Sequence, residues 1–168
     1  MRIAKIENND MINGIGVCTS VWFQGCPHHC PGCHNPETWD FKGGYEISYE
    51  ELEEEVLNKI GENGIIRNLS LLGGEPLCQQ NIAYAQRIAA AAKERYPSIR
   101  IFCWTGNFVE NIIDKYGKEV LEDIDVIIDG PFILEQRDIT LPLRGSKNQR
   151  VIDVQKSLAE NCVKLYCD

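Results

Sequence analysis

The hydrophobic pattern of the chain predicts three helices. In residues 48–60, apolar side chains recur every three or four positions, which is the period of a helix with one buried face. Ser48 followed by Glu51 forms a capping box at the start of this helix. Residues 80–96 are rich in alanine and end before a proline, so they predict a second helix. Residues 108–121 predict a third.

Short runs rich in β-branched and aromatic residues predict strands that alternate with these helices. They are residues 19–25, 65–72, 99–104 and 124–130, with further strand candidates at 150–154 and 162–166. Residues 131–149 have no clear period and predict an ordered loop. Alternating strands and helices predict an α/β fold with a mainly parallel sheet. At 168 residues, the chain is expected to form one domain.

Four loops with unusual residues follow the predicted strands. Each begins where a strand ends: CPHHCPGCHN at 26–35, GGEP at 73–76, TGN at 105–107 and DGPF at 129–132. Sites in parallel α/β folds lie at the carboxyl ends of the strands. We therefore expect these loops to meet at one edge of the sheet and to form a site.

The charge of the chain argues against nucleic acid as a partner, and its apolar segments indicate where the protein is located. The formal net charge of -8 argues against general nucleic-acid binding, which needs a basic surface. The start of the chain lacks the apolar run of a signal peptide, and no stretch is apolar over a bilayer-spanning length. We therefore expect a cytoplasmic protein without a membrane partner, whose eight cysteines are reduced rather than paired as disulfides.

The loop at 26–35 concentrates metal-binding chemistry. Cys26, Cys30 and Cys33 have the spacing C-x3-C-x2-C. One interpretation is a structural zinc ion with His34 or His28 as the fourth ligand. The other is an iron–sulfur cluster held by three thiolates, which leaves one iron free to bind a small molecule. The decapeptide alone leaves both interpretations open.

C-x3-C-x2-C after the first strands, followed by GGEP after the next, resembles the radical S-adenosylmethionine superfamily. This resemblance implies a 4Fe-4S cluster on Cys26, Cys30 and Cys33, with S-adenosylmethionine bound at the open iron. It implies that an electron from the cluster cleaves S-adenosylmethionine into methionine and a 5′-deoxyadenosyl radical. It also implies an open partial (β/α) barrel, with residues 1–168 as a single radical SAM domain. Gly32 departs from many members, which have an aromatic residue at this position.

The resemblance also implies contacts with the cofactors. The two glycines of GGEP let the backbone approach a ligand closely, and an exposed carboxylate or carbonyl beside them is expected to receive the methionine ammonium group. For several of these positions a plain turn, a strand-end cap or a solvated basic patch is the alternative. The implied cofactor-binding residues are Gly32, His34, Asn35, Gly73, Gly74, Glu75, Thr105, Gly106, Asp129 and Arg144, and Lys147 and Arg150 extend the basic patch at Arg144.

Four longer segments narrow the resemblance. CPGCHNPETWDF (30–41), LGGEPL (72–77), DGPFILEQRD (129–138) and LRGSKNQRVID (143–153) resemble the family of activating enzymes of anaerobic (class III) ribonucleotide reductase. The resemblance implies an oxidoreductase that generates a glycyl radical on the large subunit of that reductase. It implies a flavodoxin- or ferredoxin-like electron donor, and no catalytic side chain beyond the cluster and the cosubstrate.

The length of the chain supports a protein substrate, because a full eight-unit barrel takes about 250 residues. We expect five or six strands here, in a barrel whose open side a folded partner covers. The alternatives are an activating enzyme like that of pyruvate formate-lyase, a small-molecule enzyme like a deazapurine synthase, and a structural zinc module. We expect Cys103 to be buried in a strand, and we assign no role to Cys18, Cys78, Cys162 or Cys167.

Overall fold

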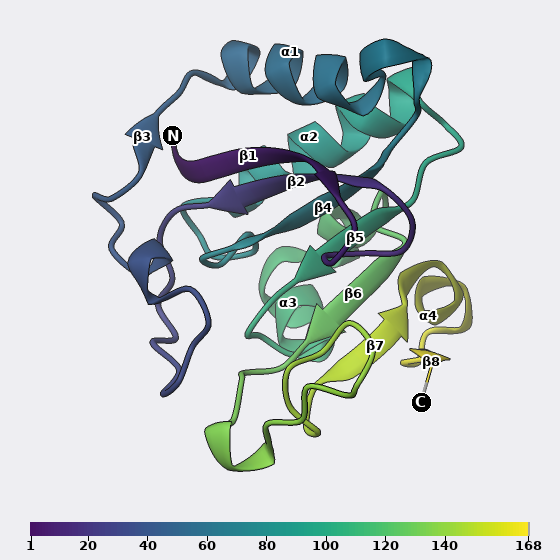
Figure 1. The fold of residues 1–168 in the computed structure, drawn as a ribbon. Helices are drawn as coiled ribbons and strands as arrows, with labels where there is room; N and C mark the ends of the chain where they lie inside the picture. Colours follow the sequence, from purple (N-terminus) through teal and green to yellow (C-terminus); the bar gives the residue numbers. More distant parts are fainter. Residues whose placement is uncertain (168) are drawn as a thin grey trace.

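The computed structural model describes residues 1–167. Within them, eight strands form one sheet in the order β3-β1-β2-β4-β5-β6-β7-β8, and the sheet does not close into a barrel (Figure 1). The strands are β1 Arg2–Asp10, β2 Cys18–Phe23, β3 Tyr45–Glu46, β4 Asn68–Gly73, β5 Ile101–Trp104, β6 Val126–Asp129, β7 Arg150–Asp153 and β8 Leu165–Cys167. The helices are α1 Tyr49–Ile60, α2 Ile82–Arg95, α3 Val109–Tyr116 and α4 Val154–Glu160.

The central strands run parallel, which confirms the predicted α/β fold with a mainly parallel sheet there, whereas the strands at both edges run antiparallel. Strands β2, β4, β5 and β6 pair in parallel. Strands β1 and β3 on one side, and β7 and β8 on the other, pair antiparallel. Eight strands exceed the expected five or six because β1 and β3 were not predicted.

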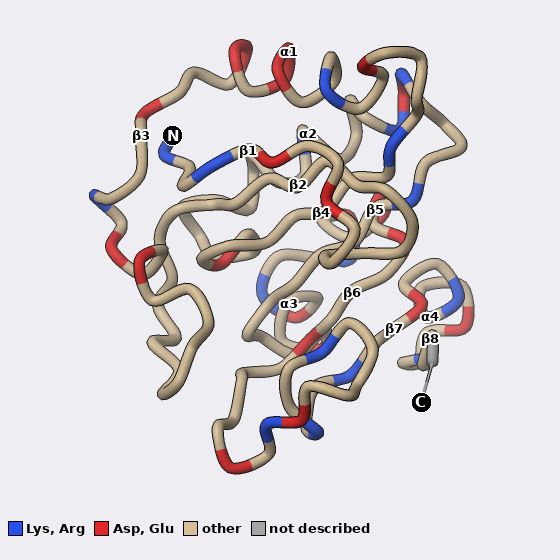
Figure 2. Tube along the Cα trace, in the orientation of Figure 1, with Lys and Arg blue, Asp and Glu red and all other residues tan. Residues whose placement is uncertain are grey.

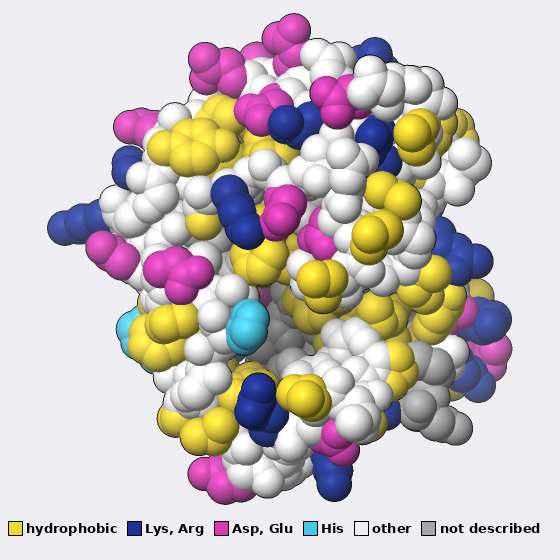
Figure 3. Space-filling view, viewed as in Figure 1, with side chains coloured by type: hydrophobic (Ala, Val, Ile, Leu, Met, Phe, Trp, Pro, Cys, Tyr) yellow, Lys and Arg dark blue, Asp and Glu magenta, His cyan; other side chains and the backbone are white. Residues whose placement is uncertain are grey.

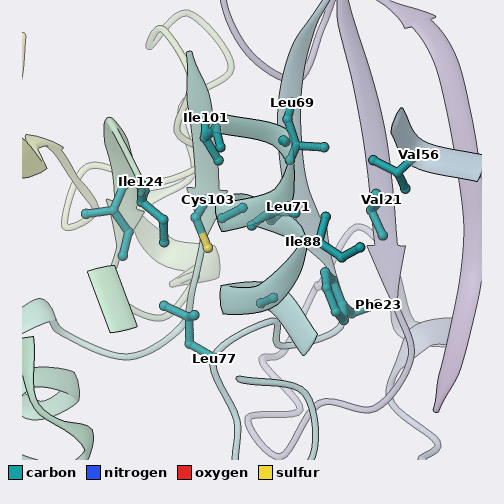
Figure 4. Packing of buried hydrophobic residues seen from close by; sticks show 14 of the residues in the cluster. Val21, Phe23, Val56, Leu69, Leu71, Leu77, Ile88, Ile101, Cys103 and Ile124 are labelled. Carbon is teal, nitrogen blue, oxygen red and sulfur yellow. The ribbon is translucent and has the colours of Figure 1, made fainter. Parts of the chain in front are cut away.

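The two faces of the sheet have different coverings. Helices α1, α2 and α3 cover one face, where the main hydrophobic core lies (Figure 4). Every second side chain of the central strands points into this core, among them Val21, Leu71 and Cys103. Cys103 is fully buried there, as predicted. A smaller cluster that includes Phe102 and Ile128 lies on the opposite face. That second face is free of these helices, so it can hold a cavity.

Several predicted elements have different bounds in the structure. The capping box at Ser48 is present, and α1 follows it as predicted. The predicted helix 108–121 is divided at Gly117, which has a φ of 85°, into α3 and a short 3-10 helix, Lys118–Leu121. Residues 131–149 form a loop with one 3-10 turn, Leu134–Gln136, as expected. The seven-residue α4 was not predicted, and β8 covers only part of the strand predicted at 162–166.

Charged residues are unevenly distributed over the chain. Acidic residues recur along α1, and residues of both signs occur within the loop 131–149 (Figure 2). No helix within residues 1–167 combines the length and the apolar character needed to cross a lipid bilayer.

Candidate cofactor site

A cavity of about 460 Å³ opens on the sheet face opposite α1, α2 and α3 (Figure 3). The four loops predicted to meet do so here: each contributes at least one residue to the wall. The loop 11–17, which joins β1 to β2, and the loop 131–149 complete it. The predicted residues in the wall are Cys26, Cys30, Cys33, His34, Asn35, Gly73, Gly74, Glu75, Thr105, Gly106 and Arg144. Its volume lies within the range of small-molecule and cofactor sites, about 300–1,000 Å³.

The three cysteines of the loop 26–35 differ in burial. Cys26 is buried at the end of β2, and burial raises the pKa of its thiol to about 11. Cys30 and Cys33 are half-buried. Among residues 1–167, no three His, Cys, Asp or Glu side chains lie close enough together to bind one metal ion. As these side chains lie, they do not form the single-ion zinc site that the decapeptide alone would allow.

Backbone contacts fix the position of the cysteine loop. The N–H of Cys26 donates to the carbonyl of Trp39, and the N–H of Cys33 donates to the carbonyl of Cys30. Gly32 has a φ of 72°, and a Cβ at this position would lie 2.8 Å from Cδ1 of Leu134. Leu134 therefore occupies the space that an aromatic residue at position 32 would need. Gly32 itself is outside the cavity wall.

The GGEP segment differs from what was expected of it. A Cβ at Gly73 would come within 3 Å of the backbone of Phe23, so this glycine allows two strand ends to approach closely. Glu75 was expected to offer an exposed carboxylate, but its side chain is fully buried. It accepts hydrogen bonds from the N–H groups of Leu77 and Gly106, and its Oε2 lies 2.9 Å from Nε2 of His28. The expectation of an exposed carboxylate is therefore wrong, and the alternative, a backbone carbonyl of this segment that receives the ammonium group, stays a prediction.

Asp129 lies outside the cavity, contrary to its predicted role as a cofactor contact. It has the same strand phase as Ile127, whose side chain enters the helix-covered core. Its carboxylate accepts from the N–H of Val109 at the start of α3 and pairs with the guanidinium of Arg150. The alternative prediction, a cap at the strand end, describes it better.

The structure divides the basic patch predicted at residues 144–150. Arg144 lies in the cavity wall, where one of its N–H groups donates to the carbonyl of Gln149. Lys147 is exposed and lies 3.9 Å from Asp138. Arg150 is held on the opposite face by the Asp129 carboxylate. Only Arg144 is therefore placed to meet a ligand in the cavity.

Sequence reasoning missed the apolar wall of the cavity. Three large apolar side chains lie within the last two residues of their strands, face away from the helix-covered core and line the cavity: Trp22, Leu72 and Trp104. Strict alternation along each predicted strand would have found them. The buried Nε1 of Trp22, Nε1 of Trp39 and Nε of Arg144 have no hydrogen-bond partner among the described residues. Since buried polar groups are nearly always satisfied, these donors fit a polar ligand in the cavity.

Two of the cysteines without an assigned role, Cys18 and Cys78, are buried and do not line this cavity. Cys162 is exposed at the end of α4. The side chain of Cys167 lies outside the described part of the chain.

Comparison with known proteins places these features in a family. Residues 12–152 match the model of a 4Fe-4S single cluster domain. The chain is 37% identical to the anaerobic ribonucleoside-triphosphate reductase-activating protein of Haemophilus influenzae over 150 residues, which cover 89% of this chain and 96% of that protein. The protein of the same name from Escherichia coli K12 is 32% identical, covering 84% of this chain and 92% of its own. That of phage T4 is 35% identical, covering 90% and 93%.

Proposed function

Because the chain belongs to the family of anaerobic ribonucleoside-triphosphate reductase-activating proteins, we propose that it is the enzyme that activates an anaerobic ribonucleotide reductase, using a 4Fe-4S cluster. One observation carries the proposal. The three cysteines of the matched cluster domain line a single cavity at the carboxyl ends of parallel strands. The finer parts of the proposal follow from the residues around them.

We propose Cys26, Cys30 and Cys33 as the cluster ligands. Thiolates are the usual ligands of iron–sulfur clusters, and three of them leave one iron open. When bound, the cluster would supply the electron that cleaves S-adenosylmethionine to methionine and the 5′-deoxyadenosyl radical, which takes a hydrogen atom from a glycine of the reductase. Cys26 must lose its proton to bind iron, and cluster loading offsets the raised pKa of this buried thiol.

The unpartnered donors support S-adenosylmethionine as the cosubstrate. Its carboxylate, ribose and adenine offer acceptor atoms to the N–H groups of Trp22, Trp39 and Arg144. We propose that Arg144 binds the carboxylate, because a guanidinium matches that group in charge and shape. His34, Asn35 and the glycines of GGEP complete the proposed contacts.

The apolar wall has its own proposed task, which is to exclude water. Trp22, Leu72 and Trp104 cover the floor of the cavity, and Phe132 and Leu143 cover its side. A reactive primary radical needs such a dry enclosure. These side chains keep water away from the position where the radical would form.

The mouth of the cavity supports a protein substrate. Ile12 in the cavity wall is 85% exposed, and its neighbour Met11 is 76% exposed. Ile139, which is 80% exposed, belongs to the loop 131–149, which also contributes to the wall. Exposed apolar residues around a site are typical of surfaces that another protein covers. We propose that the large subunit of the reductase covers them, and that a flavodoxin- or ferredoxin-like protein supplies the electron. A cytoplasmic location stays a prediction.

We also propose that residues 1–168 form a single radical SAM domain, an open partial barrel. The parallel centre of the sheet and the position of the cavity at its strand ends support this. An activating enzyme of the pyruvate formate-lyase type and a deazapurine synthase gain no support from the relatives described above, which share one name. A structural zinc module gains no support from the family model, which describes a 4Fe-4S single cluster domain.

An anaerobic turnover assay tests the proposal. The protein is loaded with iron and sulfide, mixed with S-adenosylmethionine, a strong reductant and the reductase, and assayed for 5′-deoxyadenosine and for a glycyl radical by electron paramagnetic resonance. Cys30→Ala should abolish both products, whereas Cys162→Ala, an exposed cysteine outside the cavity, should leave both unchanged. Equal turnover by Cys30→Ala and the wild type would refute the assignment. Product formation from a small molecule without the reductase would favour the deazapurine alternative.

A further inference from the structure

The fully buried side chain of Glu75 joins three segments of the chain. Its Oε1 accepts from the N–H of Leu77 at 3.0 Å, which fixes its own loop. Its Oε2 accepts from the N–H of Gly106 at 2.8 Å, which reaches the loop after β5. The same Oε2 lies 2.9 Å from Nε2 of His28, which stands midway between the first two cysteines of the loop 26–35. One carboxylate therefore connects the cysteine loop to the ends of β4 and β5.

The backbone around Glu75 strengthens this connection. The N–H of Gly74 donates to the carbonyl of Phe23 at 2.8 Å, and the N–H of Glu75 donates to the carbonyl of Gly25 at 2.9 Å. Both acceptors lie within the three residues before the cysteine loop. The side-chain N–H of Asn81 donates to the carbonyl of Glu75 at 3.0 Å. The segment that carries the carboxylate is thus held rigidly beside the start of the cysteine loop.

The ring of His28 is also confined by its neighbours. A Cβ added at Gly106 would lie 2.7 Å from Nε2 of His28, so the ring packs directly against the loop after β5. Only 22% of the His28 side chain is exposed. The ring is therefore held between the Glu75 carboxylate and the Gly106 backbone, and the middle of the cysteine loop is held with it.

We propose that Glu75 and His28 are positioning residues that hold the cysteine loop in the conformation that receives the cluster. This inference rests on the proposed function, since it assigns the cluster to this loop. A carboxylate has about four acceptor positions, and three polar groups of this chain already occupy three of those of Glu75. Because the side chain is also fully buried, it does not receive the ammonium group of S-adenosylmethionine.

The first test measures hydrogen exchange of the backbone amides in residues 26–33, before any iron is added. Glu75→Gln keeps the shape but turns an NH2 group toward an N–H donor, and His28→Ala removes the ring. Each should speed exchange in this loop at least about fivefold, because a lost buried hydrogen bond raises the population of open states by that order. Glu37→Gln is the matched control, because Glu37 is exposed and its carboxylate makes no hydrogen bond or ion pair among the described residues. It should not change the exchange.

The second test uses the loaded protein and a readout other than activity. The lifetime of the brown cluster under an iron chelator should shorten by about 10–100-fold in Glu75→Gln and in His28→Ala. The double variant should shorten the lifetime by less than the product of the two single effects, because the two substitutions share the contact between Glu75 and His28.

Separate outcomes decide the inference and the proposed function. Unchanged exchange in Glu75→Gln, together with weaker binding of S-adenosylmethionine by the loaded variant, would overturn the inference and make Glu75 a cosubstrate contact. If the wild type takes up no cluster, the proposed function fails, yet the exchange measurement still decides whether Glu75 positions the loop. Should Glu75→Gln not fold, His28→Ala carries the test, because its ring is partly exposed.

Discussion

Asp129→Asn separates a structural carboxylate from a cofactor contact. Asp129 is fully buried and shares the guanidinium of Arg150 with Glu110, whose side chain is 52% exposed. Its carboxylate also accepts from the N–H of Val109 at the start of α3. Asparagine keeps the shape and one acceptor for Val109, so the substitution removes mainly the negative charge beside Arg150.

The expected cost follows from the burial of each group. Removing one partner of a buried ion pair costs about 3–5 kcal/mol. Arg150 is 29% exposed and keeps Glu110, so solvent screening and the second carboxylate reduce the loss in the free energy of unfolding to about 2–3 kcal/mol. For a chain of this size, that corresponds to a fall in Tm of about 4–12 °C. Glu110→Gln removes the exposed partner of the same guanidinium and should cost less than about 1 kcal/mol.

The assay is thermal and urea unfolding of the cluster-free protein under anaerobic conditions. Asp129→Asn should lower the free energy of unfolding by more than Glu110→Gln, and the affinity of the loaded protein for S-adenosylmethionine should stay the same. If Asp129→Asn is no less stable than Glu110→Gln while that affinity falls, Asp129 is a cofactor contact and the argument from strand phase is wrong.

Three further predictions concern the frame of the site. Gly74→Ala places a Cβ against the carbonyl of Gly25, and urea unfolding should show a loss of about 1–3 kcal/mol; wild-type stability would contradict this packing. Burial alone would raise the pKa of Asp10, but its hydrogen bonds outweigh burial and lower the pKa below its usual 3.8. The stability from Asp10 is therefore present above pH 4 and lost as the pH falls through the lowered pKa. The Tm advantage of the wild type over Asp10→Asn should stay constant above pH 4 and shrink below it, and a constant difference below pH 4 would argue against this. Trp104→Phe removes the N–H bond to the carbonyl of Leu143 at 2.8 Å, costs about 1 kcal/mol, and should speed proteolysis in residues 131–149; unchanged cleavage would show that the bond does not hold this loop.

The parallel centre of the fold could be predicted because its strands are largely apolar runs with a glycine at the strand end or within two residues after it. Strand β1 could not, because Lys5 and Glu7 interrupt its apolar positions and two register shifts break the alternation along it. The seven-residue α4 is too short for a helical period to emerge. The edges of the sheet depend on tertiary pairing, which a local pattern does not record.

The candidate site, like the fold, could be predicted from the sequence only in part. The meeting of the four loops followed from the geometry of parallel strands, which also brings Thr105 and Gly106 to the cavity. The orientation of Asp129 and the burial of Glu75 did not follow from a motif. The first depends on strand phase, and the second depends on hydrogen-bond donors that come from distant segments.

Electron paramagnetic resonance of the reduced, iron-loaded protein tests the central claim most directly, with and without S-adenosylmethionine. Three cysteine ligands leave one iron open, so the signal of the reduced cluster should change when S-adenosylmethionine is added. The same addition should not change the signal of a cluster whose irons all carry protein ligands. An unchanged signal in the wild type, or a colourless protein that binds zinc in place of iron, would contradict the account.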